Sequence, residues 1–354
     1  MGDTVGIIGG GQLGRMLAMA AARLGLKTII LDPQENAPAF QCAYDWIVAP
    51  FDDTKALTRL AELSDVITYE FENVSVETIM GFENSVPCHP NTNALSTSQD
   101  RLIEKRFFQD LGIETAPFHE VNNAEDLAHA MALTGGAGIL KTRRFGYDGK
   151  GQVRLSCSED ERIVDAHKLV ADSPCILEGL IAFEREISII AARSTDGTVF
   201  CYDIAENVHR DGILFSSTVP ANASDRIQDN AAEVAVKVLE ALNYVGVIGI
   251  EFFVLGDGTL IANEFAPRVH NSGHWTEAAC TISQFEQHIR AVSGLLLGNP
   301  VRHSNCMMQN LIGDEIEQTA EILNRDNTLL HLYGKSETRK GRKMGHFTTI
   351  SSKS

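Results

Sequence analysis

Residues 245–276 read VGVIGIEFFVLGDGTLIANEFAPRVHNSGHWT, and this stretch decides how the rest of the chain is arranged. An apolar, β-branched run covers residues 245–255, and a second extended run begins at Thr259. Asp257 and Gly258 stand between the two runs. An Asp-Gly pair in this position predicts a β-hairpin, because a type I′ turn needs positive φ at both central residues.

A two-residue turn in this hairpin would place Glu251 opposite Glu264. Opposed side chains on antiparallel strands have Cβ atoms roughly 5 Å apart, and like charges there repel by about 3 kcal/mol at an effective dielectric near 20. Protonating one carboxylate removes the repulsion, and so does a cation such as Mg²⁺, which binds carboxylates and often shares them with phosphates. Asn263 could add a neutral oxygen only at a bulge or at the strand's end, since alternation points it to the other face. The alternative is a three-residue turn with one glutamate solvated, and the hairpin alone does not decide between them.

A dense polar loop follows the second strand. Five side chains lie within eleven positions of Glu264: Arg268, His270, Asn271, His274 and Trp275. Binding residues are concentrated on loops of this kind, next to the end of a strand. The hairpin and this loop are therefore predicted to form a binding site.

Composition limits the possible partners. The chain has 354 residues, enough for two or three domains with separate cores. Its net charge of −17 argues against nucleic acid or an anionic membrane as a partner. The seven cysteines show no C-x-x-C spacing, so we expect reduced thiols and a cytoplasmic location. No uncharged apolar run reaches the length of a membrane span.

The N-terminal residues predict a βαβ unit. A strand at residues 4–8, the turn GGGQLG at 9–14, a helix at 16–24 and a strand ending at Asp32 follow in order. The G-x-G-x-x-G turn is a dinucleotide fingerprint, but a tight turn in any doubly wound domain has the same pattern. A further strand at residues 66–69 leads into carboxylates at Glu70 and Glu72, at the strand end where open α/β sheets bind ligands. A solvated sheet edge or a helix cap is the simpler explanation of these carboxylates.

The middle of the chain carries a second glycine-rich segment. A helix is predicted over residues 98–111 and a strand over 137–142, followed by RRFGYDGKGQ at 143–152. A glycine-rich loop between strands, flanked by cations, can fold over phosphates with its backbone N–H groups. It lacks the G-K-[ST] of a Walker A motif, and a hairpin tip is the simpler alternative.

His209 and a basic segment near the C-terminus can each be explained without a functional role. His209 is expected in the loop after a strand at residues 199–205, and a single histidine is more often structural than catalytic. The segment KSETRKGRKMGH at residues 335–346 is strongly basic and has strand character before it. A solvated basic tail is the simple interpretation of that segment.

Taken together, the motifs resemble a known family. The order of Lys141, the glycine-rich loop, Glu178, Glu186, Glu251 and Asn263-Glu264 resembles the ATP-grasp superfamily, whose two lobes hold Mg-ATP. Four longer motifs make the chain similar to the N5-carboxyaminoimidazole ribonucleotide synthetase family of purine biosynthesis over essentially its whole length: GGGQLGRM at 9–16, YEFENV at 69–74, GYDGKGQ at 146–152, and YGK at 333–335 with RKGRKMGH at 339–346.

The resemblance implies roles for individual residues. It implies ATP contacts at Arg101, Lys141, Gly146, Tyr147, Asp148, Gly149, Lys150, Gly151, Gln152, Glu178, Gly179, Leu180, Ile181, Glu186, His209, Asn263 and Glu264. It implies Mg²⁺ at Glu251 and Glu264, in agreement with the hairpin argument. Catalytic roles are implied for Glu72, Lys150 and Arg268. Contacts with the ribonucleotide are implied at Tyr147, Asp148, Arg268, Lys335 and Arg342.

The resemblance also implies a fold and a reaction. The expected fold is mixed α/β and α+β. It comprises a doubly wound parallel-sheet pre-ATP-grasp domain at residues 1–98, a two-lobed ATP-grasp domain at 99–294 and a small β-rich C-terminal domain at 295–354. The expected reaction uses ATP and bicarbonate to carboxylate 5-aminoimidazole ribonucleotide, giving ADP and phosphate. A homodimer is expected on the same ground, and the glycine turn at residues 9–14 is then expected to face substrate instead of NAD.

Two other classes of function compete with this one. An NAD-dependent dehydrogenase would account for the N-terminal fingerprint, but it leaves the second glycine loop and the paired glutamates unexplained. A non-catalytic nucleotide-binding module would account for the motifs without turnover. Within the ATP-grasp superfamily, the C-terminal YGK and GRKMGH motifs argue against formate-dependent glycinamide ribonucleotide transformylase and biotin carboxylase.

Overall fold

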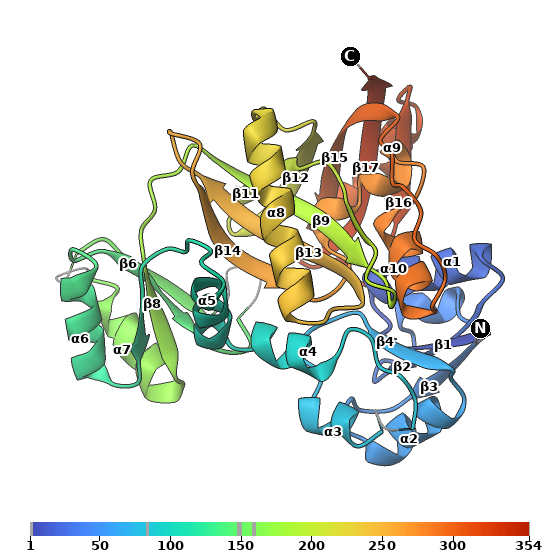
Figure 1. Ribbon diagram of the computed structural model, residues 1–354, viewed down its shortest axis with the longest axis horizontal. Coiled ribbons are helices and arrows are strands. Elements are labelled where there is room, and N and C mark those ends of the chain that lie inside the picture. The colour runs from blue at the N-terminus through green and yellow to red at the C-terminus, as the bar shows by residue number, and fades with distance from the viewer. Residues whose placement is uncertain (1–2, 83–84, 147–150, 158–160, 354) are drawn as a thin grey trace.

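The structure is a computed structural model that describes residues 3–82, 85–146, 151–157 and 161–353. Of the residues singled out from the sequence, Tyr147, Asp148, Gly149 and Lys150 lie outside the described ranges. The strands form three sheets, with the largest between the other two (Figure 1). Within the described ranges, every helix is too short or too polar to cross a bilayer.

The first sheet is parallel and has the strand order β3-β2-β1-β4. Its strands are β1 (Thr4–Ile8), β2 (Lys27–Asp32), β3 (Asp45–Val48) and β4 (Val66–Tyr69). The helices of this part are α1 (Gln12–Arg23), the 3₁₀ helix η1 (Pro38–Gln41), α2 (Thr54–Glu62), α3 (Val76–Met80) and α4 (Thr92–Ser98). Side chains alternate between two cores: Ile7 packs with α1 on one face, and Ile8 packs with α2 on the other. The predicted doubly wound domain is confirmed.

The second sheet is small and antiparallel, with the order β5-β8-β6-β7. Its strands are β5 (Phe118–Val121), β6 (Gly138–Thr142), β7 (Gln152–Leu155) and β8 (Cys175–Gly179). Helices α6 (Ala124–Leu133) and α7 (Ile163–Asp172) belong to this part, and both supply residues to its core. Helix α5 (Arg101–Asp110) connects it to the first sheet.

The third sheet has nine strands, all paired antiparallel, in the order β14-β13-β9-β11-β12-β15-β17-β16, with β10 added on β9. Its strands are β9 (Arg185–Arg193), β10 (Val199–Cys201), β11 (Ala205–Arg210), β12 (Ile213–Val219), β13 (Gly246–Val254), β14 (Leu260–Ala266), β15 (Ser304–Ile312), β16 (Thr328–Leu332) and β17 (Lys343–Ser352). The associated helices are α8 (Asp225–Ala241), η2 (Asn271–Gly273), α9 (Thr276–Ala279), α10 (Gln284–Val292), η3 (Gly313–Gln318) and α11 (Thr319–Leu323). The C-terminal strands therefore continue the sheet that contains the central hairpin.

Helix α10 joins the first and third sheets through a buried histidine. The ring of His288 accepts a hydrogen bond from the Val247 N–H at Nδ1, at 3.0 Å, and its Nε2 lies 2.8 Å from Thr68 Oγ1 on β4. Since Nδ1 is an acceptor, the proton is on Nε2, which donates to Thr68. This bridge holds the carboxyl end of β4 close to the hairpin.

Two expectations about elements are wrong in detail. The helix expected over residues 98–111 is α5, but it begins at Arg101, because the Asp100 side chain caps it by accepting from the N–H groups of Leu102 and Ile103, and Ser98 ends α4 instead. The strand expected over residues 199–205 is also two short strands, β10 and β11, that pair with different parts of β9.

Candidate active site

Strands β13 and β14 bring Glu251 and Glu264 opposite each other. The turn between them is not the two-residue turn that Asp-Gly predicted. The Leu255 N–H donates to the Thr259 carbonyl at 2.9 Å, which leaves residues 256–258 as the loop. That longer loop would misalign the glutamates, but a bulge corrects the register: Glu251 pairs with Glu264 while Phe252 pairs with Ala262.

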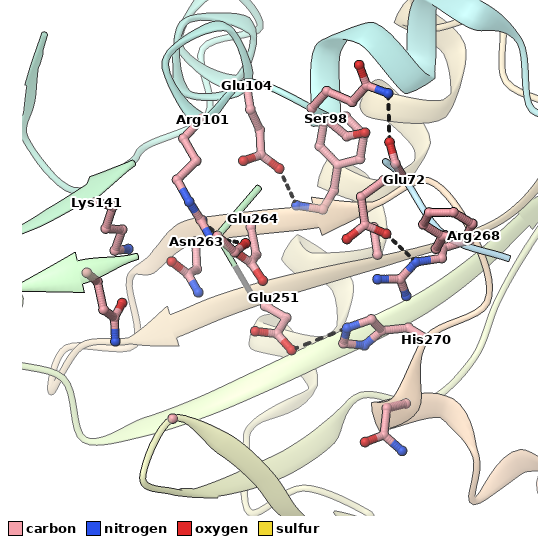
Figure 2. Close-up of a pocket in the computed structure, with 18 of the residues that line it drawn as sticks. Glu72, Ser98, Arg101, Glu104, Lys141, Glu251, Asn263, Glu264, Arg268 and His270 are labelled. Atoms are coloured by element: carbon pink, nitrogen blue, oxygen red, sulfur yellow. Dashed lines mark hydrogen bonds and ion pairs between the residues drawn. The ribbon is translucent and has the colours of Figure 1, made fainter. Parts of the chain in front are cut away.

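Asn263 is the residue that this bulge leaves unpaired. A bulge breaks the alternation of side chains, and Asn263 lines the same cavity as the two glutamates. Figure 2 shows Asn263, Glu264 and Glu251 close together. Two carboxylates and an amide oxygen are a suitable donor set for a hard cation such as Mg²⁺. The residues therefore fit the metal that the family implies.

The two carboxylates have opposite electrostatic environments. Burial, and then the charge of Glu264, raise the pKa of Glu251 to about 7. Burial acts in the same direction on Glu264, but the guanidinium group of Arg101, 2.9 Å away, outweighs it and lowers the pKa of Glu264 to about 2. Without a cation between them, one carboxylate is ionised and the other titrates near neutrality.

A buried ion-pair cluster fixes the cations beside Glu264. The carboxylate of Glu178 lies between two ammonium groups, 3.3 Å from Lys105 Nζ and 3.0 Å from Lys141 Nζ. Glu178 is 3% exposed, so these pairs are shielded from water. Lys105 also donates to the Asn263 carbonyl at 2.7 Å, which ties helix α5 to the bulge.

Glu178 acts from behind the cavity wall. Lys141 lines the cavity, whereas Glu178 does not. Burial favours the neutral carboxyl, but Lys105 and Lys141 reverse that effect and lower the pKa of Glu178 to about 2. Burial lowers the pKa of Lys141. Glu178 therefore holds Lys141 at the cavity wall from outside the cavity.

A second ion pair lies at the opposite end of the hairpin. Arg268 Nε donates to Glu72 Oε2 at 2.6 Å, linking the loop after β14 to the end of β4. Burial would raise the pKa of Glu72, but Arg268 lowers it, so this carboxylate is ionised at neutral pH. His270 lies beside Arg268, and burial followed by the Arg268 charge lowers its pKa to about 3. Its neutral ring lies 3.7 Å from Glu251 (Figure 2).

Most of the described candidates line one cavity of about 750 Å³, whose wall includes strands of the second and third sheets and the segment that follows β4 of the first. Those on its wall are Glu72, Arg101, Lys141, Gly146, Gln152, Glu186, His209, Glu251, Asn263, Glu264 and Arg268. Those off its wall are Gly151, Glu178, Gly179, Leu180, Ile181, Lys335 and Arg342. Gly151 has φ of +69°, a conformation that favours glycine at the end of the glycine-rich segment.

His209 lies on a strand and not in the loop expected from the sequence. It is in β11, and the register with β12 shifts between Val208 and His209 because Phe215 of β12 is left unpaired. Its Nδ1 lies 2.8 Å from Glu186 Oε2. Burial disfavours the imidazolium, but Glu186 and Glu251 outweigh that effect and raise the pKa of His209. The sequence missed this arrangement because Asn207 and Arg210 made a short amphipathic strand look like a polar loop.

The N-terminal glycine turn is already occupied by side chains of the chain itself. The N–H groups of Gly11 and Gly14 donate to the Glu70 carboxylate at 2.5 and 2.6 Å, and the Gly10 N–H donates to Asp32 at 2.7 Å. These amides and the helix N-terminus are what a dinucleotide pyrophosphate requires. Glu70 and Asp32 fill that position, which argues against NAD binding at this turn.

The C-terminal basic segment contributes a different residue from those expected. Lys343 lines the cavity, while Lys335 Nζ donates to the Lys343 carbonyl at 2.8 Å and Arg342 donates to the Glu337 carbonyl at 3.0 Å. The family resemblance implied Lys335 and Arg342 from this segment, and not Lys343. The missing information was that β17 begins at Lys343, on the cavity wall.

Two other wall features were missed. Glu104 accepts from the Phe265 N–H at 2.7 Å, and burial together with Glu264 raises its pKa to about 8. Its spacing from Arg101 on a helix face could have revealed it. Phe183 and Phe253 stack with ring centroids 4.6 Å apart on the cavity wall, and no local signal pairs these distant residues.

Comparison with known proteins agrees with this geometry. Residues 2–99 match the ribonucleotide synthetase preATP-grasp domain, residues 106–285 the ATP-grasp domain, and residues 306–354 the phosphoribosylaminoimidazole carboxylase C-terminal domain. The chain is 60% identical over 349 residues to the N5-carboxyaminoimidazole ribonucleotide synthase of Brucella melitensis biotype 1, covering 99% of this chain and 96% of the relative.

Solved structures show the same similarity. The ADP complex of an N5-carboxyaminoimidazole ribonucleotide synthetase superposes with a TM-score of 0.96 at 42% identity, over 99% of this chain and 93% of that one. The Aspergillus clavatus enzyme in complex with ADP and 5-aminoimidazole ribonucleotide has a TM-score of 0.92 at 32% identity, over 99% and 94% of the chains. The chain belongs to the N5-carboxyaminoimidazole ribonucleotide synthase family of ATP-grasp ligases.

Proposed function

We propose that the chain carboxylates 5-aminoimidazole ribonucleotide with bicarbonate and ATP, giving N5-carboxyaminoimidazole ribonucleotide, ADP and phosphate in purine biosynthesis. The observation that carries the proposal is the Glu251–Glu264 pair, with Arg101 and Lys141 beside it on one cavity wall. Paired carboxylates with adjacent cations suit a metal-bound polyphosphate, because each charge has an opposite partner when the ligand is present.

ATP is assigned to the part of the cavity near the small sheet. Arg101 and Lys141 supply positive charge there, and the paired side chains of Glu186 and His209 also line the cavity. The glycine-rich segment, including Tyr147 to Lys150, is assigned to the phosphates, with Gly146 and Gln152 at its ends. Gly179, Leu180 and Ile181 are assigned to the nucleotide on the strength of the family resemblance. Glu251 and Glu264, with Asn263 adjacent, would hold Mg²⁺, which when bound would neutralise charge on the phosphates.

The reaction needs ATP because bicarbonate is a poor electrophile. A bicarbonate oxygen attacks the γ-phosphorus, and ADP leaves with the electron pair of the broken P–O bond. The resulting carboxyphosphate splits into CO₂ and phosphate. The amine nitrogen then forms a bond to CO₂ and loses a proton. Fixed cations that oppose the transferring charge supply most of such catalysis, and a closed site keeps CO₂ beside the amine.

The ribonucleotide is assigned to the end of the cavity near Arg268. Glu72 is held ionised by Arg268 and can accept the amine proton. Arg268, Lys335 and Arg342 are assigned to the 5′-phosphate, since arginine offers a bidentate fork and lysine a point charge. Tyr147 and Asp148 are assigned to the same substrate.

The proposal also covers the domain boundaries, the oligomeric state and the location of the protein. We assign residues 1–98 to a pre-ATP-grasp domain, 99–294 to the ATP-grasp domain and 295–354 to a C-terminal domain that completes the substrate site. A homodimer is proposed from the family resemblance. A cytoplasmic location is supported by seven free cysteines, four of them buried.

The test is ADP release measured with ATP, Mg²⁺ and bicarbonate, with and without the aminoimidazole ribonucleotide. A carboxylase of this class should release ADP rapidly only with the ribonucleotide and form one carboxylated product per ADP. Absence of turnover with all substrates present would leave a nucleotide-binding module as the better description. Added NADH should show no change in fluorescence on mixing with the protein, since the glycine amides are occupied.

A further inference from the structure

A second cluster of polar side chains lies outside the large cavity, where the C-terminal strands meet α9. Its members are Glu277 on α9, His331 on β16 and His346 on β17. Each offers one nitrogen or carboxylate oxygen, and these atoms lie within 4.8 Å of one another. The three residues come from two segments of the chain far apart in sequence, so the fold, and not local sequence, brings them together.

The two histidines are held in register by the sheet. His331 and His346 are directly opposed on antiparallel strands, and their rings stack with centroids 5.3 Å apart at 18°. His346 is buried, and its Nδ1 lies 2.9 Å from the hydroxyl of Tyr333. A hydrogen bond to one ring nitrogen fixes the ring and leaves the other nitrogen for a ligand, as in protein metal sites.

A third histidine has an unused nitrogen at the same place. His274 is 1% exposed and lines the same cavity, of about 260 Å³, as Glu277, His331 and His346. Its Nδ1 lies 3.1 Å from the Tyr333 hydroxyl and accepts from the Asn271 side-chain amide at 3.0 Å, so the ring proton is on Nε2. That buried N–H has no hydrogen-bond partner among the residues described. A buried polar atom without a partner is costly, and buried ones are normally paired. The cavity therefore contains an N–H donor that an acceptor, such as a water molecule bound to an ion, could satisfy.

We propose that this cavity binds one divalent transition-metal ion, with Zn²⁺ as the best candidate, through Glu277, His331 and His346, with His274 beside them. Two imidazoles and one carboxylate suit Zn²⁺ and other first-row transition metals, whereas Mg²⁺ and Ca²⁺ prefer oxygen donors. If the three ligand atoms were each 4.8 Å apart, an ion at their centre would lie about 2.8 Å from each of them. The corresponding distance in zinc sites is roughly 2.0–2.2 Å. Side-chain movements of less than about 1 Å would complete the coordination.

The bound ion would connect separate parts of the protein. It would fasten the edge strand β16 and its neighbour β17 to α9. Asn271 connects the two cavities. It lines the large cavity, and its side-chain amide lies 3.0 Å from Nδ1 of His274, which lines the small one. The proposal does not depend on the nucleotide chemistry, and its test requires no turnover.

The experiment is Co²⁺ and Zn²⁺ binding to the full-length protein after removal of metal with a chelator. Excess Mg²⁺ is added so that it occupies the sites that prefer oxygen donors and keeps Co²⁺ from binding there. We expect one Co²⁺ per chain, a visible absorption spectrum of low-symmetry nitrogen and oxygen coordination, and a melting temperature raised by roughly 2–5 °C with Zn²⁺. His331→Gln should abolish the spectrum, and Glu277→Gln, an exposed position, should weaken Co²⁺ binding at least tenfold.

His129→Gln is the matched control, since His129 is exposed on α6 far from the cluster in sequence and sheet. It should bind Co²⁺ as the unsubstituted protein does. The proposal is overturned if the protein binds neither Co²⁺ nor Zn²⁺ in excess Mg²⁺, or if Glu277→Gln binds Co²⁺ with unchanged affinity. A strong near-ultraviolet thiolate band would also overturn it, because that band would put the ion on a cysteine.

Discussion

The Lys141 ammonium group lies 3.0 Å from the Glu178 carboxylate, and Glu178 itself stays outside the cavity that Lys141 lines. Lys105, which is 1% exposed, contacts the other carboxylate oxygen at 3.3 Å. Removing one partner of a buried ion pair leaves an uncompensated charge, which is far more costly than losing a surface pair. This relationship makes Glu178 a residue whose loss should affect both stability and nucleotide binding.

We expect Glu178→Gln to reduce the free energy of unfolding by about 3 kcal/mol. The KM for ATP should also rise, because Lys141 loses the group that positions it. Scanning calorimetry and steady-state kinetics would measure the two effects. The control is Glu120→Gln on the neighbouring strand, where a carboxylate that is 35% exposed pairs with Arg143. That variant should lose at most about 1 kcal/mol, and equal losses in both variants would argue against a special role for the buried cluster.

The same carboxylate predicts acid sensitivity. Its folded-state pKa of about 2 lies below the ordinary glutamate value of 4.5, so folding favours the ionised form. Its contribution to stability is therefore fully present above about pH 4.5 and is lost as the pH falls toward 2. Melting temperatures of the unsubstituted protein and Glu178→Gln should converge as the pH is lowered from 5 to about 3, and a constant difference would contradict the assignment.

Glu264→Gln tests the metal assignment. We expect kcat to fall by at least about 10²-fold, because a carboxylate that would hold Mg²⁺ at the phosphates is removed. The fold should persist, since the side chain of Glu264 faces the cavity and is 41% exposed. The loss of its Arg101 partner is offset by relief of the repulsion with Glu251. Circular dichroism and ADP release would measure both effects, and Glu240→Gln on the exposed side of α8 is the control. Near-normal turnover at ordinary Mg²⁺ would refute the assignment.

Glu251 predicts a pH dependence of Mg²⁺ affinity. Its pKa is raised from 4.5 to about 7 without a metal, so the ion must displace a proton at acidic pH. Affinity should fall about tenfold for each pH unit below 7 and level off above it. For stability the sign is the opposite of that for Glu178. Folding favours the protonated form of Glu251. The contribution of Glu251 to the free energy of unfolding is therefore fully present below about pH 4.5 and is lost as the pH rises through 7. Mg²⁺ titrations between pH 5.5 and 8.5 would test this, and Glu251→Gln should bind more weakly without the dependence.

The hairpin illustrates how far sequence reasoning reaches in this chain. The opposition of Glu251 and Glu264 is confirmed, although it rests on a longer loop and a bulge that compensate each other. Alternating residues and the Asp-Gly turn predict strands and their approximate pairing, because those signals are local. The bulge at Asn263 is fixed by Lys105, which comes from α5 and donates to its carbonyl. No pattern within the hairpin contains that information.

Other features depended on contacts that are distant in sequence. The first sheet was predictable because its βαβ units are local, and each strand fills two cores in alternation. The continuation of the large sheet through β15, β17 and β16 was not, because it depends on pairing between β12 and β15. The glycine turn looked like a dinucleotide site until Glu70, more than fifty residues later, was seen to occupy its amides.

The final prediction concerns the basic segment at the start of β17. The family resemblance selects Lys335 and Arg342 for the substrate phosphate, whereas the residue of this segment on the cavity wall is Lys343. Lys335 donates to the Lys343 carbonyl, so the two lysines are linked through the backbone. A lost charge-assisted contact costs about 1.5–3 kcal/mol, or roughly ten- to a hundredfold in affinity.

Lys343→Gln and Arg342→Ala should therefore each raise the KM for the aminoimidazole ribonucleotide by roughly ten- to a hundredfold if both touch its phosphate. The KM for ATP should change little, because ATP is assigned to the cations on α5 and β6. Lys340→Gln is the matched control, since Lys340 is an exposed cation of the same segment that does not line the cavity. If only Lys343→Gln raises this KM, the substrate phosphate is to be assigned to Lys343 on the cavity wall and not to Arg342. Unchanged substrate KM in both variants would mean that the segment is a solvated basic surface and that Arg268 carries the phosphate without it.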